Sequence, residues 1–92
     1  MRIPLELLQQ HFTARYDNRL AELVRLVEVR DFDGLQLALH SLTGIAGTYG
    51  FPQITDVARE GDQQCERRDL PALRRTIAKL VRFGESWRSH AA

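Results

Sequence analysis

The chain has 92 residues, of which 43% are apolar and 27% are charged, and its formal net charge at pH 7 is +1. This composition is typical of an ordered globular domain and excludes a disordered or fibrous chain, and the length leaves no room for a second stable core, so we expect residues 1–92 to form a single domain. The near-neutral charge gives no support to a nucleic-acid or acidic-membrane partner.

The N-terminal third of the sequence predicts a short helix followed by a long one. Pro4 suits the first turn of a helix, and the apolar residues from Leu5 to Phe12 predict a short helix that covers one end of a bundle. From about Thr13 to Arg30, apolar residues recur every three or four positions, which is the spacing of one buried helical face. The residues assigned to that face are Tyr16, Leu20, Leu23, Val24 and Val27.

Turn-forming residues separate the helices that follow. Residues 31–34 suit a turn and a helix N-cap, and a second long helix is predicted from there to about Thr48. Gly50 and Pro52 mark the next boundary, so a third helix is expected to begin near Pro52. A last helix is predicted from about Leu70 to Ser89. No segment alternates with period two, so we predict an all-α fold: an antiparallel up-down four-helix bundle with the short N-terminal helix in addition.

The second long helix carries an exposed histidine. On a helical wheel at about 100° per residue, His40 points away from the apolar arc of this helix. The arc contains Leu35, Ala38, Leu39, Leu42, Ile45, Ala46 and Tyr49, and the outer face around His40 contains Gln36, Leu37, Thr43, Gly44 and Gly47.

Two glycines on this outer face indicate a docking surface. Glycine in a helix interior costs roughly 1 kcal/mol relative to alanine, and a solvent-exposed face offers no packing reason to accept that cost. Bare backbone at Gly44 and Gly47 lets a partner approach His40 closely, while exposed Leu37 and its neighbour Gln36 provide contact points. An isolated surface histidine is ordinarily only a solvated side chain, and the glycines favour the functional interpretation.

Residues 40–51, His-Ser-Leu-Thr-Gly-Ile-Ala-Gly-Thr-Tyr-Gly-Phe, followed by Ile54 and Val57, resemble the signature of histidine-containing phosphotransfer domains. That signature has a histidine, an apolar residue two positions later, Lys-Gly, an alanine, a second glycine and then apolar residues of the next helix. The predicted helices and the turn at Arg30-Asp31 also precede the histidine as they do in this family. Two positions depart from the pattern: Thr43 replaces the usual lysine, and Asp62 stands where Gln or Glu often orients the imidazole.

The resemblance implies a phosphocarrier without kinase activity of its own. His40 would accept a phosphoryl group from a receiver-domain aspartate or a hybrid sensor histidine kinase and pass it to a response regulator. Neutral imidazole is a competent nucleophile near pH 7, so no activating base is needed. Thr43, Gly44 and Asp62 would surround the phosphoryl group and the imidazole. The receiver would supply Mg²⁺ and a lysine, and the chain itself would need no cofactor or metal.

The sequence also indicates the setting in which the chain works. Cys65 is the only cysteine, so it cannot form an intrachain disulfide or a Cys-based metal site alone, and a buried packing role in a reducing compartment is expected. Met1–Leu8 lacks the apolar run of a signal peptide, and no segment approaches membrane-spanning length. We expect a cytoplasmic monomer with no membrane or nucleic-acid partner.

Three alternatives stay open at this point. The first is a docking module with the same fold that binds a receiver or kinase but is never phosphorylated, which the replacement at Thr43 supports. The second is nucleic-acid binding through the basic outer face of the last helix, from Arg74 to Arg88. The third places further phosphorylation or metal sites at His11 and His90, although neither has glycine neighbours or ligand-spaced partners.

Overall fold

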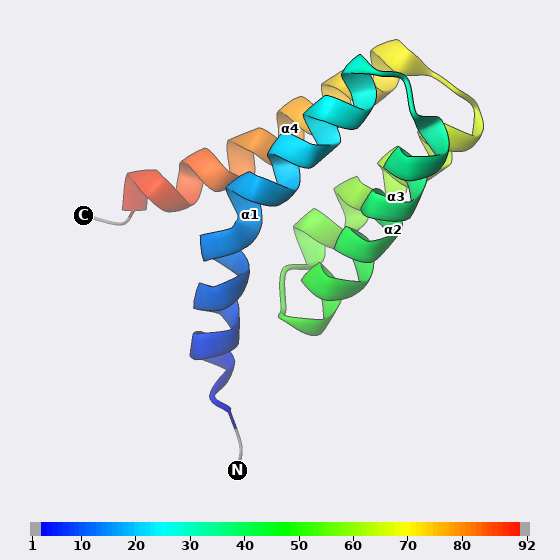
Figure 1. The fold of residues 1–92 in the computed structure, drawn as a ribbon. Coiled ribbons are helices and arrows are strands. Elements are labelled where there is room, and N and C mark those ends of the chain that lie inside the picture. The colour runs from blue at the N-terminus through cyan, green and yellow to red at the C-terminus, as the bar shows by residue number, and fades with distance from the viewer. Residues whose placement is uncertain (1–2, 91–92) are drawn as a thin grey trace.

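The computed structural model describes residues 3–90, with side chains described as far as residue 87, and consists there of four helices without strands (Figure 1). Their bounds are α1 Leu5–Glu28, α2 Phe32–Thr48, α3 Pro52–Glu66 and α4 Leu70–His90. Short turns join consecutive helices, and α4 returns to pack against α1, so each helix contacts its two neighbours around the bundle. The predicted helical fold class and the principal boundaries are confirmed.

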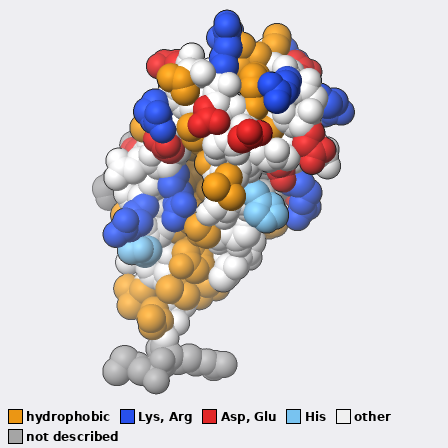
Figure 2. All heavy atoms as spheres, turned by 45° about the vertical axis from the view of Figure 1, so that its right-hand side comes forward, with side chains coloured by type: hydrophobic (Ala, Val, Ile, Leu, Met, Phe, Trp, Pro, Cys, Tyr) orange, Lys and Arg blue, Asp and Glu red, His pale blue; other side chains and the backbone are white. Residues whose placement is uncertain are grey.

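The predicted separate N-terminal helix is wrong, because α1 runs without interruption from Leu5 to Glu28. No glycine or proline lies inside this segment, so nothing breaks the ladder of backbone hydrogen bonds between residues 12 and 13. Figure 1 shows that α1 changes direction along its length, and Figure 2 shows apolar side chains at the N-terminal end of the molecule. The first turns still contact the bundle end, where the Gln9 side-chain amide donates to the Tyr49 carbonyl at 2.9 Å.

Each connection between helices contains one residue in the left-handed backbone region. Gly50 has φ +82°, as suits the predicted glycine cap, whereas Arg30 and Arg68 adopt φ 56° and 53°. The predicted N-cap of the second long helix also forms: the Asp31 carboxylate accepts from the Gly34 backbone N–H at 2.9 Å, and α2 begins immediately afterwards. These local signals bring α2 and α3 together as an antiparallel pair, and this pair carries the candidate site.

The core contains most of the predicted apolar residues, with one exchange on α1. Val24 was predicted to be buried but is exposed, and Leu26, on the opposite flank of the same helical face, is buried instead because it packs against Gly34 at the start of α2. At the other end of the bundle, Phe12, Tyr16, Phe51 and Trp87 form an aromatic cluster with ring centroids 4.7–6.2 Å apart. Trp87 is therefore a packing residue at this end of the bundle.

Close packing around Gly61 fixes α3 against both of its neighbours. A Cβ atom at Gly61 would lie 3.1 Å from Leu39 Cδ1 and 3.2 Å from Thr76 Cγ2, so the missing side chain permits this approach. Next to it, the buried Thr76 hydroxyl donates to the Gln64 side-chain oxygen at 2.6 Å. Because α3 is held this close to α2, Asp62 on α3 comes beside His40 on α2.

The described helices include none that is both long enough and apolar enough to cross a membrane.

Candidate functional site

His40 lies on the outer face of α2, as the wheel predicted. Its side chain is 79% exposed, whereas its neighbour Leu39 is fully buried. The buried face is formed by Leu35, Leu39, Leu42 and Ala46, with Ala38, Ile45 and Tyr49 packed partly against it. The imidazole is therefore open to a partner, while the backbone that carries it belongs to a rigid core helix.

Asp62 is the nearest acidic group to the imidazole. Its Oδ2 lies 3.7 Å from His40 Nδ1, which is beyond hydrogen-bond range but close enough for electrostatic attraction. The Asp62 side chain is only 25% exposed, and its Oδ1 is buried without a hydrogen-bond partner. Nδ1 is the ring nitrogen that faces the carboxylate, which leaves Nε2 as the candidate nucleophile.

A shallow hollow of about 380 Å³ lies beside His40 and is lined by Asp33, Gln36, Leu37 and Asp62. Leu37 is the most exposed large apolar residue described, at 72%. Gln36 is half-buried and donates from its amide to Glu66 at 3.3 Å, so its orientation is already set by α3. The structure therefore groups Gln36 and Leu37 with His40, as the sequence predicted.

The two glycines of this face differ in their surroundings. A Cβ atom at Gly44 would meet nothing within 4 Å, so no contact among the described residues requires a glycine there. A Cβ atom at Gly47 would lie 3.4 Å from the Thr55 hydroxyl on α3, which is an ordinary van der Waals distance, so the packing of α2 on α3 does not require a glycine there either. The described contacts therefore leave the small size of both positions unexplained.

Thr43 has its hydroxyl committed to the backbone. The hydroxyl donates to the Leu39 carbonyl at 2.9 Å, and the Thr43 carbonyl accepts from the Thr55 hydroxyl at 3.3 Å. In this conformation the Thr43 proton cannot be donated to a phosphoryl group on His40. The side chain therefore supplies neither the charge of the usual lysine nor a free donor.

The sequence analysis named Asp62 beside His40 but missed Asp33, the second acidic residue of the site. Asp33 and Asp62 line the hollow of about 380 Å³ together with His40. A second hollow of about 350 Å³ also borders His40, and its other lining residues are Ser41, Gly44, Ile45, Thr48 and Tyr49. Neither set of described lining residues includes a lysine or arginine. Asp33 could have been found, because it precedes His40 by seven residues, or two turns of the same helix face.

The other candidate residues occupy separate places. His11 is exposed on α1, and the side chain of His90 lies outside those described. Cys65 is buried, as predicted, and burial raises its thiol pKa to about 11. On the basic outer face of α4, Lys79 lies 3.8 Å from Glu60. Within the part of the chain that the structure describes, no three His, Cys, Asp or Glu side chains are grouped as metal ligands.

Comparison with known proteins identifies the family. The model of the Hpt domain family matches residues 7–87, which covers all four helices apart from the ends of α1 and α4. No match to this chain was found among the curated proteins or the solved structures. The exposed histidine on α2 and the helical fold agree with the match. The chain belongs to the Hpt domain family, whose members are phosphotransfer modules of two-component signalling.

Proposed function

We propose that this chain carries a phosphoryl group on His40 and exchanges it between two-component signalling proteins. The donor is a receiver-domain aspartyl phosphate or a hybrid sensor histidine kinase, and the acceptor is a response regulator. The observation that carries the proposal is the 79% exposed imidazole on the family-matched helix α2, beside a glycine that no internal contact requires. We expect residues 1–92 to act as one unit, a cytoplasmic monomer.

The transfer step needs little chemistry from the chain itself. The lone pair of His40 Nε2 attacks the phosphorus in line with the aspartyl oxygen, the new N–P bond forms, and the aspartate leaves as a carboxylate. The proton on Nδ1 stays beside Asp62, which stabilises the cationic ring that forms. Receiver-bound Mg²⁺ and a receiver lysine supply the charge that stabilises the phosphoryl oxygens.

The surroundings of His40 support close docking rather than charge stabilisation. Leu37 and Gln36 lie on one side of the imidazole. On the other side, Gly44 and Gly47 have no side chain, so the helix backbone is accessible there. A partner can therefore bring its backbone near α2 while it makes an apolar contact with Leu37. These four residues are the proposed contact points.

A labelling experiment with a matched control tests the assignment. The purified chain is mixed with phosphorylated receivers from the same cell, using the wild type, His40→Gln and His11→Gln. We expect transfer to the wild type and to His11→Gln, and none to His40→Gln, with equal helical circular-dichroism signals. Label that persists on the His40→Gln variant refutes the assignment.

A second candidate is a docking module that is never phosphorylated. One support is that the Thr43 hydroxyl already donates to the Leu39 carbonyl, so it is not available to a phosphoryl group. The other is that no lysine or arginine is among the described residues that line the two hollows at His40. The two candidates differ in one observable, because only the phosphocarrier acquires phosphate that is labile in acid and stable in base. A chain that binds receivers but never acquires such phosphate is the docking module.

A further inference from the structure

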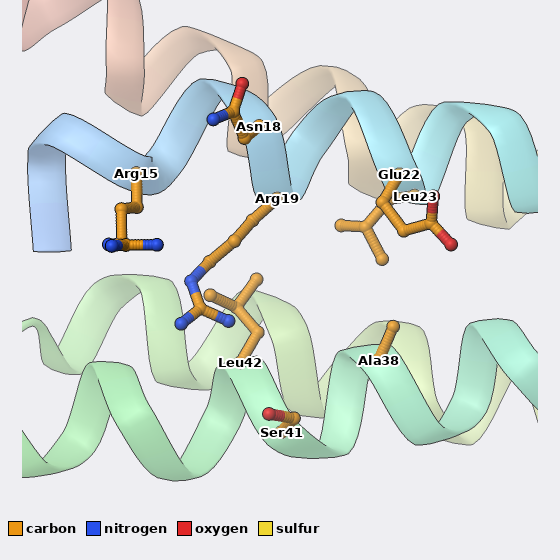
Figure 3. Close-up of a pocket in the computed structure, with 8 residues that line it drawn as sticks. All are labelled: Arg15, Asn18, Arg19, Glu22, Leu23, Ala38, Ser41 and Leu42. Atoms are coloured by element: carbon orange, nitrogen blue, oxygen red, sulfur yellow. The ribbon is translucent and has the colours of Figure 1, made fainter.

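A cleft between α1 and α2 lies outside the immediate surroundings of His40. It has a volume of about 300 Å³; Arg15, Arg19 and Glu22 line it from α1, and Ser41 and Leu42 line it from α2. Figure 3 shows the Arg19 side chain extending from α1 toward Leu42, with Arg15 on the same side of α1. We call this feature the arginine cleft.

The two guanidinium groups of the arginine cleft have no acidic partner among the described residues. Among the described residues, no carboxylate oxygen lies within 4.0 Å of Arg15 or Arg19, and the Nε of half-buried Arg19 is buried without an acceptor. Among the described residues that line the cleft, the one acid is Glu22, which accepts two hydrogen bonds of 2.7 and 2.9 Å from Arg25. The cleft therefore presents positive charge that the fold does not neutralise.

The arginine cleft is continuous with the surface around His40. Ser41 follows His40 in the chain, and it lines both the arginine cleft and the hollow that contains His40 and Gly44. A specific partner covers about 800 Å² of each surface, so a partner centred on His40 extends past Ser41 onto α1. Covering two unpaired guanidinium groups without an opposite charge costs binding free energy, because they lose hydration with no compensating interaction.

We propose that the arginine cleft receives an acidic side chain of the receiver domain that docks over His40. An aspartate or glutamate carboxylate would accept hydrogen bonds from Arg15 and Arg19, and its aliphatic part would lie on Leu42. This inference rests on the proposed function in that the partner is a receiver. It assigns to α1 a role in partner choice, since receivers that carry an apolar or basic residue at this point are disfavoured.

The test measures binding without phosphoryl transfer. Purified, unphosphorylated receiver domains from the same genome are titrated against three variants of the chain. The first carries His40→Gln only, the second adds Arg15→Gln and Arg19→Gln, and the third adds Arg74→Gln and Arg75→Gln instead. The last pair removes the same charge from exposed positions on α4 and is the matched control. Circular dichroism and thermal unfolding verify that each variant is folded.

We expect the Arg15→Gln/Arg19→Gln pair to raise the Kd of the bound receiver about tenfold and to make binding less sensitive to salt. The control pair should change the Kd less than twofold. Equal effects of both pairs, no effect of the first pair, or no binding by any receiver would overturn the proposal. The labelling experiment on His40 separates the two proposals. If binding depends on the arginines but His40 of the wild-type chain is never labelled, the arginine cleft is a docking site and phosphotransfer is rejected. If His40 is labelled but binding does not depend on the arginines, phosphotransfer stands and the role of the cleft is rejected.

Discussion

Replacing Gly44 with alanine should raise stability and lower phosphotransfer in the same variant. A Cβ atom there meets nothing within 4 Å, so the substitution introduces no clash. Alanine is favoured over glycine in a helix interior by about 1 kcal/mol, and Gly44 lies well inside α2. For a domain of this size, 1 kcal/mol corresponds to a rise in Tm of about 4–8 °C.

The expected loss of activity comes from the same methyl group. Gly44 follows His40 by one helical turn and lines a hollow with it, so the added Cβ stands where the partner's backbone would approach. We expect the rate constant for transfer from a phosphorylated receiver to fall about tenfold. Urea unfolding followed by circular dichroism gives the stability, and single-turnover labelling gives the rate.

Gly61→Ala is the matched control, because its geometry predicts the opposite effect on stability. Its Cβ would press on Leu39 and Thr76, and neither can move easily, since Leu39 is fully buried and Thr76 is hydrogen-bonded to Gln64. Overpacking costs about 1–3 kcal/mol, which exceeds the gain in helix propensity. A Gly44→Ala variant that is less stable than the wild type would show that a side chain does clash there, and one that transfers phosphate at the wild-type rate would show that the partner does not approach the backbone at Gly44.

Three further predictions concern the site and the core. Thr43→Lys should accelerate transfer or lengthen the phosphohistidine lifetime, measured by loss of label with time, because it adds the missing cation; no change in either would mean that the partner supplies enough charge. Tyr16→Phe should lower the free energy of unfolding in urea by about 1–3 kcal/mol, because the buried Tyr16 hydroxyl donates to the Leu80 carbonyl at 2.6 Å; an unchanged midpoint would contradict that. Cys65 has its pKa raised from 9.0 to about 11, so the unfolded chain ionises first, and the contribution of Cys65 to stability should be complete below pH 9 and lost as the pH rises toward 11. Comparison of urea midpoints at pH 8 and pH 10.5 for wild type and Cys65→Ala measures this, and equal pH dependence in both would count against it.

Local chemistry explains why the helix boundaries could be predicted. The Asp31 cap, Gly50 and Pro52 each act within a few residues, so their effects appear in the sequence at the positions where they operate. The predicted break within α1 was wrong for a local reason as well. Pro4 was correctly interpreted as the beginning of a helix, but no glycine or proline follows within α1 to end that helix.

Contacts between helices could not be predicted in the same way. The wheel placed His40 and Gly44 on one face, since both belong to α2, but the approach of Asp62 depends on the packing of α3 at Gly61. The hydrogen bond from Thr43 to Leu39 depends on a rotamer that the sequence does not specify. Periodicity assigns residues to a face, and only tertiary packing decides which faces meet.

The phosphotransfer function is tested most directly by locating the phosphoryl group after transfer. The wild-type chain is incubated with a phosphorylated receiver, digested under basic conditions, and mapped by tandem mass spectrometry. We expect one phosphate on the imidazole of His40, and ³¹P NMR should assign it to Nε2, since Nδ1 is the nitrogen that faces Asp62. Phosphate on any other residue, or a chain that binds the receiver and carries none, would contradict that function.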